Sequence, residues 1–176
     1  MTHRWISATH GDVIEELNRE EAEAFLRRQV VGRVACHDEG RTYVVPVMYV
    51  WEDDCVYVQS IEGRKIRMMR ANPEVCFEVD EYEAESGSWR SVIVEGTYEE
   101  LEGTRSEKAL ALLVERFERT RDPNEPRSPH APVAFRVKAR TVTGRRVERT
   151  RTMRAMQAAG RALGRRHAAI ARRSDT

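Results

Sequence analysis

Residues 30–60 read VVGRVACHDEGRTYVVPVMYVWEDDCVYVQS, and this stretch indicates a sheet of antiparallel strands. Apolar and β-branched residues fill three runs that are separated by two short polar turns, the first of which contains Gly40. Consecutive strands are therefore expected to pair as hairpins. Proline cannot donate to a sheet ladder, so Pro46 marks an edge, a bulge, or a place where something other than a strand lies alongside. The expected strands are 30–38, 42–52 and 55–60.

The rest of the chain predicts further strands, with short helices between some of them. Asn18 and Glu21 form a capping-box pattern, and Thr104 and Glu107 form a second, so a helix is expected to start at each. The stretch 74–82 alternates between apolar and mostly acidic residues, which is typical of a half-buried strand. The expected helices are 19–28, 63–71 and 104–120, the later strands are 74–82, 89–101 with a bulge at Gly96, and 133–148, and 121–132 is a proline-rich loop.

Six strands that arrive mostly as hairpins favour a mainly β fold, an antiparallel barrel with flanking helices. The pattern lacks alternating strand–helix units, and neither GxGxxG nor GxxxxGK[ST] occurs, so the Rossmann and P-loop classes are excluded. A chain of 176 residues is long enough to bury the core of one domain. We expect that domain over 12–148 and a basic C-terminal tail over 149–176.

The net charge of +1 hides an asymmetry between the body and the tail. Residues 149–176 carry eight Arg and one Asp, a net charge of +7, so the first 148 residues have a net charge of −6. Three interpretations of the tail stay open: a helix packed on a partner subunit or on the acidic body, a disordered basic segment, or a contact with nucleic acid or an anionic membrane. Gly160 and Gly164 interrupt its helix-forming residues.

Several classes of protein and site are not expected. No apolar stretch approaches the ~18–20 residues of a membrane span, and the N-terminus lacks the pattern of a secretory signal, so the expected location is the cytoplasm. Cys36, Cys55 and Cys76 lie in strand-like runs and are interpreted as small buried apolar residues, with a reactive or metal-bound thiol as the alternative. The five histidines are scattered, so no metal site is predicted. No Ser-His-Asp or Cys-His arrangement nominates a hydrolase.

A cluster of cations stands out in residues 60–80, SIEGRKIRMMRANPEVCFEVD, between two strand-like runs. The cluster could be a solvated helix face, a grip on nucleic acid, or a site for one small phosphate. Nucleic acid fits less well, because the surrounding body is acidic and a polyanion favours an extended basic surface.

The start of the predicted helix favours the phosphate over the solvated face. Arg64 and Lys65 lie in its first turn, where the positive end of the helix dipole makes cations unfavourable unless an anion joins them. Ser60 and Gly63 precede them, and free N–H groups beside a hydroxyl and two cations form a physically sound phosphate site. Two further cations lie toward the helix end, where they suit the dipole and need no ligand: Arg67 and Arg70.

Two quoted stretches carry a resemblance: VGRVACHDEGRTYVVPVMYVWEDDCVYVQSIEGRKIRMMRANPEVCFEVDEY (31–82) and WRSVIVEGTYEEL (89–101). Together they resemble the pyridoxamine-5′-phosphate-oxidase-related family of FMN-binding split-barrel proteins, in particular the branch containing nitroimidazole-resistance proteins. The motifs are specific in combination: a GR[LV]A strand, a YVVPV strand, a [HQ]S-x-x-G-[RK]-K turn, an NP-x-VCFEVD strand and a [WR]SV-x-x-G strand. The resemblance covers about 12–148 and leaves the tail outside it.

The resemblance implies a six-stranded split β-barrel that forms a homodimer, with two FMN molecules at the interface. A ligand beside the strand would also explain its proline, because a missing donor costs nothing there. The residues implied to contact FMN are Ser60, Arg64 and Lys65 at the phosphate with Gln59 and Gly63 beside them, Val45, Pro46, Val47 and Met48 along the isoalloxazine, and Trp89, Arg90 and Ser91 from the same site or across the dimer.

The function implied is that of an FMN-dependent oxidoreductase that moves electrons from a reduced nicotinamide donor to a small-molecule acceptor. No catalytic residue is assigned, and oxidation of vitamin B6 is not predicted. One alternative is a non-catalytic carrier or sensor of flavin, deazaflavin or haem on the same barrel, since Gln59 stands where the resistance branch often has His. A second is a nucleic-acid-binding regulator that uses the basic tail.

Overall fold

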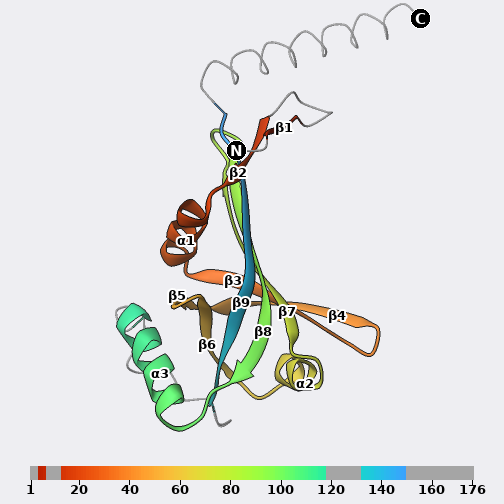
Figure 1. The fold of residues 1–176 in the computed structure, drawn as a ribbon, viewed down its shortest axis with the longest axis vertical. Coiled ribbons are helices and arrows are strands. Elements are labelled where there is room, and N and C mark those ends of the chain that lie inside the picture. The colour runs from red at the N-terminus through yellow and green to blue at the C-terminus, as the bar shows by residue number, and fades with distance from the viewer. Residues whose placement is uncertain (1–3, 7–12, 118–131, 150–176) are drawn as a thin grey trace, which may run out of the picture.

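A computed structural model describes residues 4–6, 13–117 and 132–149, and its strands join in one antiparallel sheet (Figure 1). Three helices accompany the strands in these ranges. The strands are β1 (Arg4–Ile6), β2 (Val13–Leu17), β3 (Val31–Asp38), β4 (Arg41–Met48), β5 (Val50–Glu52), β6 (Cys55–Ile61), β7 (Glu74–Glu83), β8 (Ser88–Glu100) and β9 (Pro132–Val147). The helices are α1 (Arg19–Arg28), α2 (Arg64–Ala71) and α3 (Gly103–Phe117).

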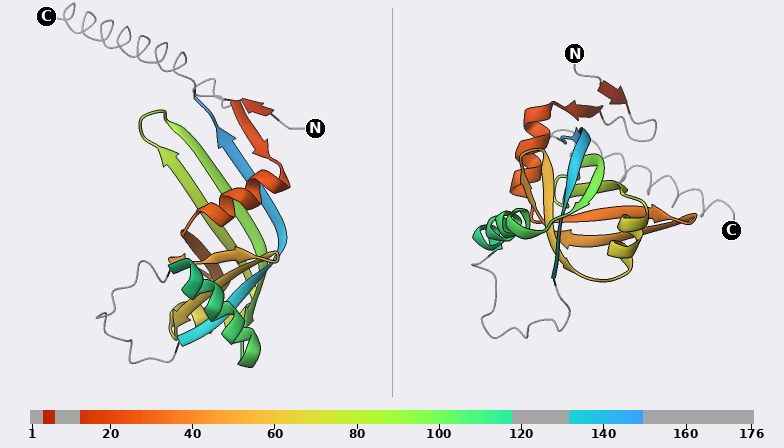
Figure 2. Two further views of the ribbon diagram at one scale, coloured as in Figure 1. Left: turned by 90° about the vertical axis from the view of Figure 1, so that its left-hand side faces the viewer. Right: turned by 60° about the horizontal axis from the view of Figure 1, so that its bottom comes forward.

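Six of these strands form the split barrel that the sequence predicts, which confirms the fold class. They follow one another in the order β4, β3, β7, β8, β9 and β6, and each neighbouring pair is antiparallel. Strands β4 and β6 lie near each other but do not pair, so the barrel is split between them. Figure 2 shows that β7, β8 and β9 continue beyond the barrel, with α1 across their face.

Three short strands in the described ranges were not predicted separately. β2 pairs with the C-terminal end of β9, and β1 pairs with β2. The N-terminal end of β9 pairs with β6. The expected strand 42–52 is two strands, because the chain leaves β3 at Tyr49 and β5 pairs with β6 instead. The Tyr49 N–H donates to the Val30 carbonyl (3.2 Å), and this is the last hydrogen bond between the two chain segments before β5 turns to β6. β4 is the last strand in the sheet order, so the edge position offered for Pro46 holds.

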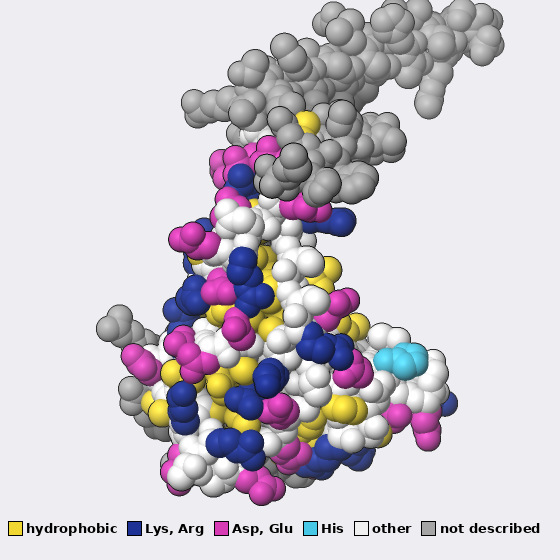
Figure 3. Space-filling model, in the orientation of Figure 1, with side chains coloured by type: hydrophobic (Ala, Val, Ile, Leu, Met, Phe, Trp, Pro, Cys, Tyr) yellow, Lys and Arg dark blue, Asp and Glu magenta, His cyan; other side chains and the backbone are white. Residues whose placement is uncertain are grey.

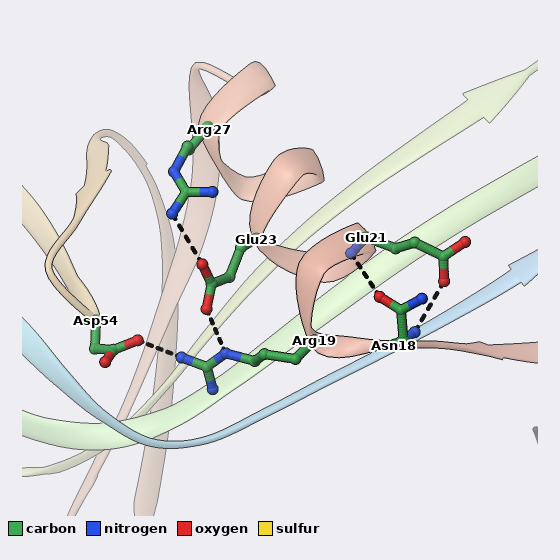
Figure 4. Close-up of polar contacts among 6 residues, drawn as sticks. All are labelled: Asn18, Arg19, Glu21, Glu23, Arg27 and Asp54. Atoms are coloured by element: carbon green, nitrogen blue, oxygen red, sulfur yellow. Dashed lines mark hydrogen bonds and ion pairs between the residues drawn. The ribbon is translucent and has the colours of Figure 1, made fainter. Parts of the chain in front are cut away.

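Helix α1 begins as predicted, with both halves of the capping box formed (Figure 4). The Asn18 side chain accepts from the Glu21 N–H (2.9 Å), and the Glu21 carboxylate accepts from the Asn18 N–H (2.9 Å). Arg19 then pairs with Glu23 on the helix and with Asp54 in the β5–β6 turn. The start of α1 is therefore capped locally and tied to the barrel by charge.

Helix α3 starts one residue earlier than predicted. Gly103 is already helical, so Thr104 lies in the first turn instead of at the N-cap, and the second capping box is a wrong prediction. The Arg116 guanidinium donates to the carbonyls of Arg27 (2.9 Å) and Arg28 (3.0 Å), so α3 satisfies acceptors at the end of α1. The predicted loop 121–132 lies outside the described residues except for Pro132, the first residue of β9.

The barrel core is apolar and includes helix side chains. Phe77 and Phe135 are fully buried inside the barrel, and α2 adds Ile66 and Met69 to the same core beside β3. Burial raises the pKa of all three cysteine thiols, which are free. Cys36 and Cys55 are buried as expected, whereas Cys76 is only half-buried. None of the described helices combines the length and the apolar character that a membrane crossing would demand.

Replacing Tyr49 by Phe should lower the free energy of unfolding by about 1–2 kcal/mol. The Tyr49 hydroxyl donates to the Leu26 carbonyl (2.7 Å) in the core, and the variant would leave that buried acceptor without this donor. Urea unfolding measures the change. Tyr82→Phe is the matched control, because Tyr82 is 65% exposed and its hydroxyl makes no hydrogen bond with the described residues. Equal stability of the two variants would contradict the prediction.

Candidate functional site

The predicted phosphate site lies where the barrel is split. β6 ends at Ile61 and α2 begins three residues later, so Ser60 and Gly63 are next to the helix start. The Arg64 guanidinium lies 4.6 Å from the centre of the Tyr43 ring on β4, which brings α2 against β4. The fold therefore brings β4, the end of β6 and the start of α2 into one region.

The N-terminus of α2 has no cap from a side chain. Gly63 is its N-cap residue, and its first turn contains no acidic residue. A Cβ placed on Gly63 would meet nothing within 4 Å, so the approach to the first helical N–H groups is open. Among the residues that the structure describes, the Ser60 hydroxyl makes only a long hydrogen bond (3.3 Å) to the Ile61 carbonyl. These groups are available to an anion.

The cations of α2 divide into two kinds. Arg70 is engaged by protein carboxylates, since it pairs with Glu62 (2.9 Å) and with Glu100 (2.7 Å). Within the ranges that the structure describes, no carboxylate forms an ion pair with Arg64 or Lys65, and the same holds for Arg67. Burial lowers the pKa of Lys65, because the charged amine is partly removed from water. A bound anion would offset that penalty.

β4 offers an unpaired backbone edge to the same region. It pairs only with β3 among the described strands, so the other edge of Val45–Met48 has free N–H and C=O groups apart from the missing donor of Pro46. Val45 and Val47 face the core, whereas Pro46 and Met48 face outward. Gln59 is exposed on β6, beside Ser60.

The structure does not bring Trp89, Arg90 and Ser91 to the start of α2 within one chain. Trp89 pairs with Tyr82, whereas Thr97, eight positions along β8, pairs with Glu74 near the end of α2. At ~3.3 Å per residue, that separation is roughly 26 Å. Successive residues also face opposite sides, and Arg90 stacks over the Phe25 ring of α1 (5.5 Å), away from the side of Trp89 and Ser91.

One outer face of the barrel exposes several large apolar side chains. By strand alternation, the side of β4, β3, β7 and β8 that points away from the core includes five of the eight large hydrophobic side chains exposed in the described ranges. Val44 is 56% exposed and Met48 is 46% exposed. Arg33 pairs with Asp80 in the middle of this face. The five residues of this outer face are Val31, Val44, Met48, Tyr82 and Ile93.

Sequence reasoning did not single out Tyr43. Arg64 stacks over its ring, but the two residues are 21 positions apart and come from different elements. An aromatic residue at the start of a strand is common, so the sequence contains no signal for this contact.

Replacing Glu100 by Gln should flatten the pH dependence of stability below about pH 5. The hydrogen bonds from Arg70 hold the pKa of Glu100 below its usual range. A carboxylate with a lowered folded-state pKa stabilises the protein above the unfolded pKa and loses that contribution as the pH falls through the folded one. Urea unfolding of both proteins between pH 6 and pH 3 measures it. If the free energies of unfolding of the two proteins fall in parallel as the pH is lowered, the prediction is wrong.

Comparisons with known proteins agree with the split-barrel fold. Residues 18–146 match the family model described as pyridoxamine 5′-phosphate oxidase. A FAD-binding protein from Mesorhizobium loti is 35% identical, with 76% of this chain and 97% of that chain covered and a TM-score of 0.63. A candidate 5-nitroimidazole antibiotic resistance protein from Bacteroides thetaiotaomicron shares the fold at 21% identity, with coverages of 82% and 92% and a TM-score of 0.61. An uncharacterized protein of Rhizobium meliloti is 34% identical over 92 residues, which span 52% of this chain and only 60% of that protein.

Proposed function

Because the chain belongs to the pyridoxamine 5′-phosphate oxidase family, we propose that it binds FMN at the split of the barrel and works as a flavin-dependent oxidoreductase. The observation that carries the proposal is the start of α2. It combines an uncapped helix N-terminus, an open approach at Gly63, and two cations, Arg64 and Lys65, that no described carboxylate pairs. A flavin phosphate satisfies all three features at once.

The remaining predicted contacts extend from that anchor. With the phosphate at Ser60, Arg64 and Lys65, the free edge of Val45–Met48 would hydrogen-bond the polar edge of an isoalloxazine ring, which is supported by the nearness of Arg64 to β4. Bound flavin supplies two-electron redox chemistry between a reduced nicotinamide donor and a small-molecule acceptor. The protein would contribute the phosphate anchor at the start of α2 and the unpaired backbone edge of β4.

A homodimer is part of the proposal. The apolar outer face favours association, since exposed hydrophobic patches of this kind mark interaction sites. A second copy docked there would supply its own Trp89 and Ser91, which lie on the same side of β8 as Ile93. Such a dimer would bring together the two groups of predicted site residues that a single chain keeps apart. Analytical ultracentrifugation measures the association.

FAD is the second candidate cofactor, and Arg67 favours it. Arg67 follows Arg64 by one turn on an exposed side of α2 and has no carboxylate partner in the described ranges, so it is available to a second phosphate. The similar protein from Mesorhizobium loti is named as FAD-binding. Deazaflavin and haem are further cofactors that the same barrel would be tested for.

An absorbance spectrum of the purified chain, with mass identification of the released chromophore, tests the proposal. We expect flavin bands and the mass of FMN, whereas the mass of FAD would select the second candidate. A colourless chain that takes up neither added flavin would contradict flavin binding. Oxidation of NAD(P)H with an electron acceptor separates an enzyme from a non-catalytic carrier.

Nucleic-acid binding is less well supported. The predicted tail lies outside the described residues except for Arg149. On the face drawn in Figure 3, acidic and basic side chains are interspersed, whereas a polyanion favours a continuous basic surface. A salt-sensitive shift of DNA by the intact chain, absent after removal of 150–176, would favour the regulator instead.

A further inference from the structure

The contact between Tyr43 and Arg64 is the most specific feature of the candidate site that its proposed function leaves unexplained. Tyr43 lies on β4 with its ring half-buried against the core, and the Arg64 guanidinium stacks over that ring at 4.6 Å. Arg64 itself is exposed and lies in the first turn of α2, next to the open N-terminus.

We propose that Tyr43 is a positioning residue that holds Arg64 ready for the cofactor phosphate and thereby selects phosphorylated flavins over riboflavin. The inference rests on the proposed flavin function and extends it to a residue on another element. Tyr43 would act through Arg64 and not by touching the phosphate.

The chemistry of stacking supports this role. A guanidinium over an aromatic face is held by the ring's electron density, while the N–H groups at its edge stay free to donate. A carboxylate partner would occupy those donors, as Glu100 occupies the Nε and Nη2 donors of Arg70 (2.7 Å each). Arg64 is therefore ordered without losing its capacity for a bidentate bond to a phosphate.

Preorganisation also has a measurable value. An exposed arginine has many rotamers, and fixing one of them on binding weakens affinity. Tyr43 restricts those rotamers before the ligand arrives, because its own ring is held in place by packing against the core. Loss of the ring should therefore weaken only ligands that use Arg64.

The test measures the dissociation constants of FMN, FAD and riboflavin for the intact chain by flavin fluorescence. Tyr43→Leu should weaken FMN and FAD binding about three- to tenfold and leave riboflavin within about twofold. Tyr43→Phe should bind all three like the unmodified protein, because the ring is kept. In an Arg64→Ala background, Tyr43→Leu should have no further effect on FMN.

The outcomes separate the possible roles of the ring. Equal weakening of FMN and riboflavin by Tyr43→Leu would overturn the inference and assign the ring to the isoalloxazine or to the fold. So would an undiminished effect in the Arg64→Ala background. Tyr43→Val replaces Tyr43→Leu if the latter fails to fold. If the unmodified chain binds no flavin, the proposed function is overturned as well. If the unmodified chain binds flavin and Tyr43→Leu keeps the same preference for FMN over riboflavin, this inference alone is overturned.

Discussion

The double variant Arg64→Ala/Lys65→Ala is expected to bind FMN about 10²- to 10⁴-fold more weakly than the unmodified chain. Each cation would contribute a charge-assisted hydrogen bond to the phosphate, worth about 1.5–3 kcal/mol. A factor of ten in affinity corresponds to about 1.4 kcal/mol, so the two losses together span that range. Titration of flavin fluorescence measures the two dissociation constants.

Two controls make this result specific to the phosphate. Riboflavin lacks the phosphate, so its affinity should change little in the same variant. Arg105→Ala removes one positive charge from an exposed position at the start of α3 and should leave FMN binding unchanged. If riboflavin is weakened as much as FMN, the phosphate is not anchored at the start of α2.

Gly96→Ala is expected to destabilise the fold by about 2–3 kcal/mol. The register of β8 on β9 shifts between Glu95 and Gly96, which confirms the predicted bulge. A Cβ at Gly96 would lie 2.3 Å from the Lys138 carbonyl oxygen and 2.9 Å from Cγ1 of Val137. The carbonyl belongs to the backbone of β9, so relief requires the β8–β9 ladder to move. A fall of roughly 5–10 °C in the melting temperature should accompany the loss.

Gly63→Ala is the matched control for that substitution. Gly63 has an extended φ of 173° and open space around a would-be Cβ, so the free energy of unfolding should stay within about 1 kcal/mol. The added methyl group would, however, enter the space assigned to the phosphate and weaken FMN binding. A Gly96→Ala protein as stable as Gly63→Ala would show that the bulge can relax.

The local elements of the fold could be predicted because short-range contacts decide them. The capping box of Asn18 and Glu21 joins residues three apart, and the alternation of 74–82 reports the buried side of one strand. The bulge at Gly96 and the start of the cationic helix near Gly63 were also visible as local patterns. The order of hairpins then restricted the fold to an antiparallel barrel.

The break at Tyr49 was missed because its cause is not local. The sequence 42–52 is almost continuously apolar, and only the partners of Tyr49 separate β4 from β5. Besides the Val30 carbonyl, those partners are the Leu26 carbonyl on α1 and the Phe77 ring on β7, whose centre lies 4.7 Å from that of Tyr49. Neither is near Tyr49 in the sequence.

By itself, the sequence determined the strands of the barrel and the capped start of α1, and it predicted a phosphate site at Ser60, Arg64 and Lys65. These follow from periodicity, turn residues and the helix dipole, which act over a few residues. Only the tertiary structure decided that Arg64 stacks over Tyr43, that Trp89 lies far from α2 in the same chain, and that one outer face exposes five large apolar side chains. These features depend on strand register and on how a hairpin closes over a helix, and contacts between residues distant in sequence set both.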